Sequence, residues 1–325
     1  MDVTRRGKTS RRNYTVPNPA LPTAEIAAAV TFARAEKAES TRRAYRSDFE
    51  IFQTWCSERK VSVLPATAEA VAAFIAFEAA RSIKPSTIAR RVAAIRYAHK
   101  LAGHETPTDA ETVRATLRGI RRTVGTALIR KAPITAERMR AMAAATPDTP
   151  IGLRDRALLL VGFAGALRRS ELVALNVDDI EETEGGLCVR IGRSKTDQEG
   201  QGAIIAIVPG SVACPIKAIK SWLAAGKITD GPIFRQIVKG GRVTAGRLSD
   251  KSVVDIIKCY AQRIGLDAKS VAGHSLRAGF LTSAAARGAS IFKLMDVSRH
   301  RSVDTLRGYV RDAEMFRDHA GIGLL

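Results

Sequence analysis

Apolar residues recur at helical spacing through the first third of the chain. Tyr45, Phe49, Phe52 and Trp55 follow one another at steps of four, three and three residues, which places them on one face of a helix. Similar spacing continues in three further segments, "AEAVAAFIAFEAAR" (68–81), "STIARRVAAIRYAHKLAG" (86–103) and "TDAETVRATLRGIRRTVG" (108–125). The pattern therefore predicts a helical bundle over residues 23–124.

Two of the predicted helices carry a recognisable start signal. Thr108 is followed three residues later by Glu111, the spacing of a capping box in which each side chain binds a backbone N–H of the first turn. Ser249 precedes the amphipathic run "DKSVVDIIKCYAQRIG" and is a second N-cap candidate. We expect helices to begin at these positions.

The pattern changes in the second half of the chain. "LCVRIG" (187–192) and "AIIAIVP" (203–209) are rich in β-branched residues and are joined by the polar loop "RSKTDQEGQG", which predicts a β-hairpin. Helices are predicted before it at 135–145 and 152–164, and three short helices end the chain. The fold class is therefore mainly α, a helical bundle followed by a mixed α+β domain with a small antiparallel sheet.

The helical periodicity breaks at "VGTALIRKAPI", between Gly125 and Pro133, which we interpret as an interdomain linker. The predicted organisation is a basic arm (1–22), a helical domain (23–124), a linker (125–134) and a second domain (135–325). Two domains also suit a chain of 325 residues, which is long for a single core.

Charge narrows the class of partner. The chain has 52 Lys and Arg against 32 Asp and Glu, a formal net charge of +20, which favours a polyanion such as DNA. The longest apolar run, "ALLLVGFAGAL", has 11 residues and is too short for a membrane span. The four cysteines are far apart and form no CxxC pair, so neither a metal site nor a disulfide is expected. We expect a cytoplasmic protein.

The excess of basic over acidic residues is concentrated between residues 81 and 131, which hold 12 basic and 3 acidic residues. Such a run can simply be a solvated face, but arginines opposite the apolar face of two successive helices suit phosphate contacts and groove insertion. The candidate DNA-binding residues of the first domain are Arg42, Arg43, Arg90, Arg91, Arg96, Arg121 and Arg122.

A set of polar residues recurs in order through the second domain. "GALRRSELVAL" supplies Arg168 and Glu171, and the hairpin loop supplies Lys195. "GHSLRAG" supplies His274 and Arg277, and "SRHRSVDTLRGYV" supplies His300 and Tyr309. Each pair alone is a weak signal. The remaining arginines of the last stretch, Arg299, Arg301, Arg307 and Arg311, are expected to contact backbone phosphates or solvent.

Taken in order, this set resembles the tyrosine recombinases, the family of Cre, the Xer recombinases and phage integrases. The resemblance covers the whole second domain, and "STRRAYRSDFEIFQTWC" and the helices after it resemble the helical, SAM-like core-binding domain of that family. It implies a C-shaped clamp on DNA and no metal, ATP or other cofactor. It also implies that Arg168, Lys195, His274, Arg277, His300 and Tyr309 occupy the six active-site positions, with Glu171 supporting the first arginine.

The chemistry of these side chains agrees with that reading. Tyr309 can attack a phosphodiester and form a covalent 3′-phosphotyrosine, while Arg168 and Arg277 bind its non-bridging oxygens. His300 can donate a further hydrogen bond, and Lys195 can protonate the leaving 5′ oxygen. His274 either accepts the tyrosine proton or orients the tyrosine.

The resemblance further implies double-stranded DNA with inverted-repeat sites as partner, a homodimer on each site and a homotetramer at synapsis that works through a Holliday junction. The apolar C-terminal tail, ending in Ile322, Leu324 and Leu325, is expected to contact a neighbouring protomer or to pack on its own. Two alternatives remain, a type IB topoisomerase with the same chemistry and a non-catalytic DNA-binding protein. A nucleoid-associated recombinase of a prokaryote, phage or mobile element is the expected setting.

Overall fold

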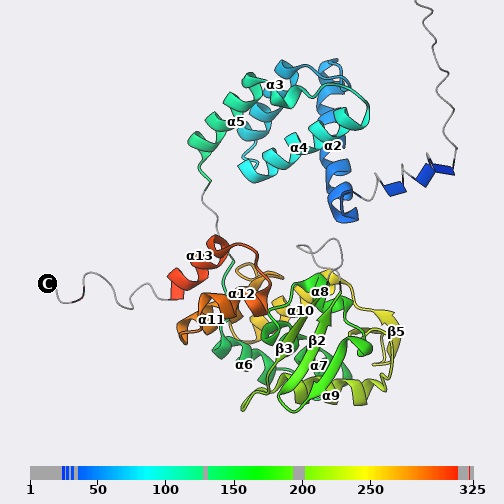
Figure 1. Cartoon of the computed structure of the whole chain (residues 1–325), viewed down its shortest axis with the longest axis vertical. Helices are drawn as coiled ribbons and strands as arrows, with labels where there is room; N and C mark the ends of the chain where they lie inside the picture. The colour runs from blue at the N-terminus through cyan, green and yellow to red at the C-terminus, as the bar shows by residue number, and fades with distance from the viewer. Residues whose placement is uncertain are drawn as a thin grey trace, which may run out of the picture. The chain divides into compact units, whose positions relative to one another are not determined.

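The computed structural model describes residues 24–25, 27–28, 31–32, 36–126, 131–192, 202–313 and 322. The chain divides into two compact units at residue 128, each with its own hydrophobic core (Figure 1). The predicted fold class is confirmed, because helices dominate both units and the strands of the second unit are antiparallel. None of the described helices is long and apolar enough to cross a membrane.

The first unit is helical, as its periodicity predicts. Its elements are α2 (Glu39–Arg59), α3 (Ala68–Ala80), α4 (Pro85–Leu101), the 3-10 turn η1 (Pro107–Asp109) and α5 (Glu111–Val124). Phe52 of α2 lies fully buried against Phe74 of α3, with ring centroids 5.1 Å apart. Trp55 is buried beside them, whereas Tyr45 and Phe49 are partly exposed at the edge of this core. The predicted apolar face of α2 is thus confirmed.

The predicted capping box is wrong. Thr108 lies in η1, where its buried hydroxyl accepts a hydrogen bond from Nε of Arg96 at 3.0 Å. Helix α5 begins only at Glu111, with Ala110 as its N-cap and no side-chain cap. A contact with another helix has therefore taken the hydroxyl that the local sequence assigns to the helix start. The second signal is confirmed, since Ser249 accepts from the backbone N–H of Ser252 at 3.1 Å at the start of α10.

The second unit combines helices with two small antiparallel sheets. Its helices before and between the strands are α6 (Ala136–Ala144), α7 (Pro150–Ala164), α8 (Arg169–Ala174), the 3-10 turn η2 (Val177–Asp179) and α9 (Pro215–Gly226). The strands are β1 (Ile180–Thr183), β2 (Gly186–Ile191), β3 (Ala203–Ile207), β4 (Arg235–Ile237) and β5 (Val243–Arg247). The chain ends with α10 (Asp250–Arg263), α11 (Ser275–Ala286), α12 (Ile291–Ser298) and α13 (Val303–Ala313).

The predicted hairpin is confirmed as the pairing of β2 with β3, in which Val189 faces Ile205. The pattern of residues does not predict β1, which pairs with the other side of β2, or the separate β4–β5 pair. Both additions are short strands with mixed burial, so alternation along the sequence is too brief to reveal them.

Helix α7 lies at the centre of the second core. Its residues from Ala157 to Val161 are almost fully buried, and Trp222 of α9 is fully buried in the same cluster. Helices α11, α12 and α13 pack on one another around a separate small cluster that contains Leu281, Leu294 and Leu306 (Figure 1). This arrangement brings the C-terminal motifs of the sequence to the same region.

The extended segment at residues 131–135, just before α6, belongs to the second unit. Ile134 is fully buried, and its backbone N–H bonds to the carbonyl of Ser275 at 3.0 Å. Gly279 of α11 lies against the same segment, because a Cβ at this position would come 1.7 Å from the carbonyl oxygen of Ile134. The end of the predicted linker is therefore fixed to the helix that carries Arg277.

Candidate active site

Arg168 and Glu171 form a buried pair at the start of α8. Nη1 of Arg168 donates to Oε1 of Glu171 at 2.6 Å, and the backbone N–H of Arg168 donates to Oε2 at 2.9 Å. The exposed fractions are 9% for Arg168 and 3% for Glu171. Arg168 is the N-cap residue of α8 and has an extended backbone. Glu171, one turn later, therefore also accepts a hydrogen bond from the N-cap backbone N–H, which has no partner within the helix.

Arg277 of α11 is held by backbone oxygens from two other segments. Its Nη1 donates to the carbonyl of Ala166 at 2.6 Å, and its Nη2 donates to the carbonyl of Ser298. The same Nη2 lies 3.4 Å from the ring nitrogens of His300. With an exposed fraction of 4%, Arg277 joins the turn after α7 to the end of α12 and fixes the position of His300 between them.

His300 has a defined tautomer. The hydroxyl of Ser298 lies 2.5 Å from the carbonyl oxygen of Leu294 and 2.7 Å from Nδ1 of His300. A hydroxyl has one proton and a carbonyl can only accept, so Ser298 donates to Leu294 and accepts from Nδ1–H. The neutral ring therefore presents an unprotonated Nε2.

Burial and the neighbouring positive charges shift the pKa values of Arg277, His300 and Glu171. Desolvation, with the charges of Arg168 and Arg299, lowers the pKa of Arg277 to about 9. Desolvation also lowers the pKa of His300 to about 4, and Arg277, Arg168, Arg299 and His274 contribute in the same direction. Burial alone would raise the pKa of Glu171, but the charges and hydrogen bonds of Arg299 and Arg168 bring it below its usual value. A concentrated positive field of this kind suits a bound anion.

Two further predicted residues lie near this cluster. His274 is the N-cap residue of α11 and is exposed, and its charge is one of those that act on His300. Tyr309 of α13 is partly buried among the apolar residues of the small cluster, and its charge acts on Arg277. Lys195 lies outside the described residues. The structure thus gathers six of the seven predicted residues, counting Glu171, in one region of the second unit.

Arg299 makes a contact that the sequence did not reveal. Its side chain has an exposed fraction of 9%, and its Nη2 lies 2.5 Å from Oε2 of Glu171. The expected contact of Arg299 with solvent is therefore wrong, because the side chain is buried against Glu171, and a contact with phosphate stays a prediction. Arg301 and Arg307 are exposed, the latter 3.7 Å from Asp304, and nothing is described for the side chain of Arg311. The contact between Arg299 and Glu171 could not be predicted from the sequence, because the two residues lie 128 positions apart and no local spacing relates them.

The candidate DNA-binding arginines of the first unit differ in their surroundings. Arg91 has a side-chain exposure of 12% and is ion-paired with Glu78 and, at 3.7 Å, with Asp48. Arg90 binds the same Asp48 through two nitrogens yet keeps a side-chain exposure of 53%. Arg42 is partly buried, Arg96 is ion-paired with Asp109, and Arg43, Arg121 and Arg122 are exposed. Arg90 and Arg96 of α4 are also exposed, but both are bound by carboxylates of their own unit. Arg121 and Arg122 at the end of α5 are therefore better placed to meet an anionic partner.

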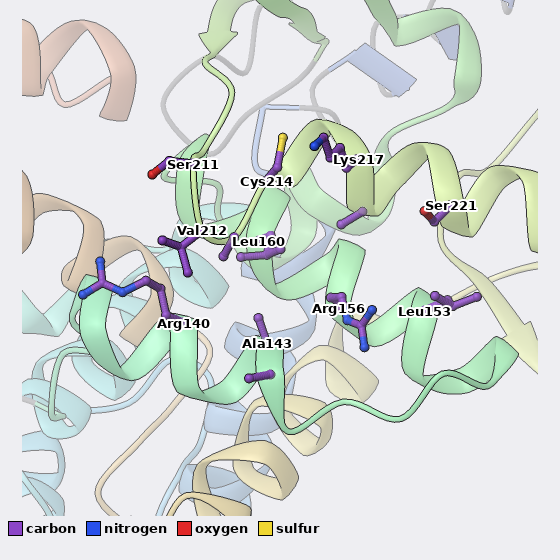
Figure 2. A pocket seen from close by; sticks show the side chains of 13 residues that line it. Arg140, Ala143, Leu153, Arg156, Leu160, Ser211, Val212, Cys214, Lys217 and Ser221 are labelled. Carbon is purple, nitrogen blue, oxygen red and sulfur yellow. The ribbon is translucent and has the colours of Figure 1, made fainter.

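A cavity of about 360 Å³ lies on another part of the second unit, between α6, α7 and α9. Figure 2 shows Arg140, Arg156 and Lys217 beside the apolar side chains of Leu160 and Val212. Arg156 donates hydrogen bonds to the carboxylate of Asp148 at 2.9 Å and to the hydroxyl of Thr146 at 2.6 Å. The lining contains none of the predicted catalytic residues, so this cavity is not part of the site described above.

Two family models match the sequence of this chain. Residues 132–315 match the phage integrase family, and residues 32–106 match the phage integrase N-terminal SAM-like domain. The chain belongs to the phage integrase family of tyrosine recombinases. It is similar to an integrase/recombinase xerD homolog of Selenomonas ruminantium, with 39% identity over 290 residues that cover 87% of this chain and 85% of the relative. It is also similar to the recombinase cre of Escherichia phage P1, at 25% identity, with 80% of each chain covered.

Solved structures share the fold. A lambda integrase dimer bound to a COC′ core site matches with a TM-score of 0.61 at 17% identity, covering 91% of this chain and 96% of that one. The Tn1549 transposon integrase in complex with transposon right-end DNA matches with a TM-score of 0.58 at 12% identity, covering 90% and 98%. Relatives named as recombinases and integrases, together with this fold, make this chain a site-specific recombinase of the tyrosine type.

Proposed function

We propose that the chain binds double-stranded DNA at inverted-repeat sites and exchanges strands through a covalent 3′-phosphotyrosine at Tyr309 and a Holliday junction. The observation that carries the proposal is the group formed by the buried Arg168 and Arg277 and the partly buried His300, held by Glu171 and by backbone oxygens close to Tyr309. Guanidinium groups fixed in this way can stabilise a phosphoryl transition state without reorganising during the reaction.

The proposed reaction is a pair of transesterifications. The Tyr309 oxygen attacks phosphorus, the bond from phosphorus to the 5′ oxygen breaks, and the tyrosine proton passes to His274 or is released beside it. Lys195 gives a proton to the leaving 5′ oxygen. Because one phosphodiester replaces another, the bond energy is kept for rejoining and neither ATP nor a metal ion is required.

Each group has a distinct electrostatic task. Arg168 and Arg277 offer fork-shaped donors to the two non-bridging oxygens, and an arginine on such a transition state can be worth about 10³- to 10⁵-fold in rate. Protonation of the leaving oxygen by a group such as Lys195 is typically worth about 10²- to 10⁴-fold. His300, once it takes up a proton, adds a donor from Nε2 on the same side.

For assembly, we propose two protomers on each site and four at synapsis, joined through the C-terminal tail. Most of the tail lies outside the described residues, and the apolar side chain of Ile322 is 69% exposed, which supports a contact outside its own unit. A chain truncated at Asp318 is expected to bind a single half-site normally and to lose cooperative filling of the second one in a mobility-shift titration. Unchanged cooperativity would overturn the tail-mediated contact.

The covalent step is tested with a DNA duplex that carries the native flanking sequences and a nick beside the presumed cleavage point, so that the released end diffuses away. On a denaturing gel, the wild-type chain is expected to give a slower, protease-sensitive band that the variant Tyr309→Phe lacks. Mobility-shift binding by both proteins without any covalent band would favour a non-catalytic DNA-binding protein. Relaxation of any supercoiled plasmid, with no need for paired sites, would favour a topoisomerase.

A further inference from the structure

Arg299 has an unusual backbone for an arginine. It follows α12 with φ 58° and ψ 38°, in the left-handed region. A non-glycine residue is disfavoured in this conformation, and glycine is the residue commonly found at this position after a helix. The side chain is nevertheless ordered by an ion pair with Glu171 at 2.5 Å and by a hydrogen bond from Nη1 to the carbonyl of Val297 at 2.9 Å. The strained backbone therefore aims the guanidinium at Glu171.

The carboxylate of Glu171 is divided between two arginines. Oε1 accepts from Nη1 of Arg168 at 2.6 Å, while Oε2 accepts from the backbone N–H of Arg168 and from Nη2 of Arg299. An isolated carboxylate beside an arginine prefers to bind two of its nitrogens in parallel. With Oε2 occupied by Arg299, Glu171 holds the Arg168 side chain through one nitrogen.

We propose that Arg299 is a positioning residue: by binding Oε2 of Glu171 it prevents the carboxylate from clamping Arg168 with both oxygens, and so keeps the guanidinium of Arg168 available to the scissile phosphate. This role rests on the proposed function of Arg168. Removing Arg299 leaves Oε2 with the backbone N–H of Arg168 as its donor and gives this buried oxygen room for a second one. The Arg168 side chain, which already binds Oε1, can supply that second donor, so the arginine turns from the phosphate towards Glu171.

The charge of Arg299 has a second effect, which can be measured without DNA. Arg299 stands among the groups that face His300, together with Arg277 from α11, Arg168 at the start of α8, and His274. All of them oppose protonation of the ring. Loss of Arg299 removes one of these cations and so makes His300 easier to protonate.

Three variants of Arg299 separate the effect of its charge from that of its hydrogen bonding, and a fourth variant controls for general surface charge. Arg299→Met removes the guanidinium but keeps an extended side chain, and Arg299→Lys restores the charge. Arg299→Gln keeps a donor without charge and serves as a second test should the methionine variant not fold. Arg301→Met is the matched control, because it removes one positive charge two positions away from an exposed site.

The first readout is the NMR titration of His300 in the free protein. Relative to the wild type, whose midpoint is expected near pH 4, Arg299→Met and Arg299→Gln should titrate at higher pH, by about 0.5 to 1 unit. Arg299→Lys should return the midpoint close to the wild-type value, and Arg301→Met should shift it much less. An unchanged midpoint in both uncharged variants would overturn the electrostatic coupling of Arg299 to the site.

The second readout is single-turnover cleavage of the nicked substrate. Arg299→Met is expected to cleave about 10- to 100-fold more slowly, with a DNA dissociation constant within about threefold of wild type, since the interaction matters after binding. The same substitution made in a Glu171→Gln background should have a much smaller further effect, because Arg299 acts through that carboxylate. Equal losses in both backgrounds would show that Arg299 acts without Glu171 and would overturn the proposal.

The two readouts also separate this inference from the proposed function. If the wild-type chain formed no covalent band, the proposed reaction would fail, while the His300 titration would still report whether Arg299 controls the charge of the cluster. If the wild type cleaved normally and Arg299→Met cleaved equally well, the positioning role alone would be wrong.

Discussion

Single residues in this protein are placed by a few charged contacts rather than by packing alone. Arg277, with 4% exposure, is bound by the carbonyls of Ala166 and Ser298, two segments that its own helix joins. Burying an arginine without such acceptors would be costly, so the two carbonyls that satisfy the guanidinium also fix where it lies. The same reasoning applies to Glu171, which is 3% exposed and bound by Arg168 and Arg299.

One prediction at this scale concerns the pH dependence of DNA binding. Because the pKa of His300 is about 4 in the free protein, the ring is neutral at pH 7.5. A phosphate placed beside it adds negative charge and raises this pKa, so the bound state takes up a proton and affinity must increase as pH falls. Between pH 7.5 and 5.5, wild-type affinity is expected to strengthen about three- to tenfold more than that of His300→Asn. Fluorescence anisotropy at constant salt measures both.

Equal pH dependence in the two proteins would mean that His300 does not receive a proton when DNA binds. A His104→Asn variant, altered at an exposed histidine of the first unit, is the appropriate comparison for general effects of losing a histidine.

At the scale of elements, the candidate active site depends on close contacts between helices and extended chain. Helix α11 carries Arg277 and packs on α13, which carries Tyr309. On its other side, Gly279 allows α11 to lie directly against the backbone at Ile134. The absence of a side chain at one position therefore determines how deeply the helix sits, and with it the position of the arginine two residues earlier.

Replacing Gly279 by alanine should consequently destabilise the second unit. The added Cβ would lie 1.7 Å from the carbonyl oxygen of Ile134, which is backbone and cannot move without displacing the segment before α6. We expect a loss of about 2 to 4 kcal/mol in the free energy of unfolding, measured by urea denaturation. Gly185→Ala is the control, since a Cβ there meets nothing within 4 Å. Similar stability of the two variants would contradict the close approach.

Helix α5 allows a test of electrostatic binding. Arg121 is exposed near its C-terminal end, and a phosphate contact there would release about one counterion. Arg121→Ala is expected to lower the slope of log affinity against log salt by about one, uniformly for different DNA sequences. Arg121→Lys, which keeps the charge, should leave the slope nearly unchanged. An unaltered slope in the alanine variant would show that this arginine is a solvated surface residue.

At the scale of the whole molecule, the described residues form one large core in each unit, and these two cores share no residues. Phe52, Phe74 and Ile88 belong to the first, whereas Leu158 and Trp222 belong to the second. Each core excludes water from its own set of apolar side chains, so each unit should have its own stability. The net charge of +20 is a property of the entire chain and acts on partners at longer range than either core.

Large-to-small substitutions should therefore act on one unit at a time. Phe74→Ala removes a fully buried ring that contacts Phe52 and Trp55, at an expected cost of about 3 to 5 kcal/mol. Hydrogen exchange followed by mass spectrometry should show faster exchange within 36–126 and little change within 131–192 and 202–313. Leu158→Ala should give the reverse. Loss of protection in both units from either variant would mean that they unfold as one.

Much of this organisation could be predicted from the sequence. Helical periodicity gave α2 to α5 because a buried helix face repeats over many turns, and alternation gave the β2–β3 hairpin. The residues of the candidate active site were also predictable as an ordered set, since each lies within a short recognisable motif, while their catalytic roles remain a proposal. The short strands β1, β4 and β5 were not, because three to five residues carry too little periodicity.

The order of residues along the sequence thus determined which side chains of this protein are available for chemistry. The tertiary structure decided which of these side chains contact one another. Thr108 has the spacing of a helix cap, yet it binds Arg96 of another helix. Arg91 and Arg90 are neighbours with the same chemistry, but one is buried against Glu78 and the other remains half exposed. Arg299 reaches Glu171 across 128 positions. Such pairings depend on how separate elements pack and on the cost of burying an unpaired charge, and neither is encoded in the spacing of residues along the chain.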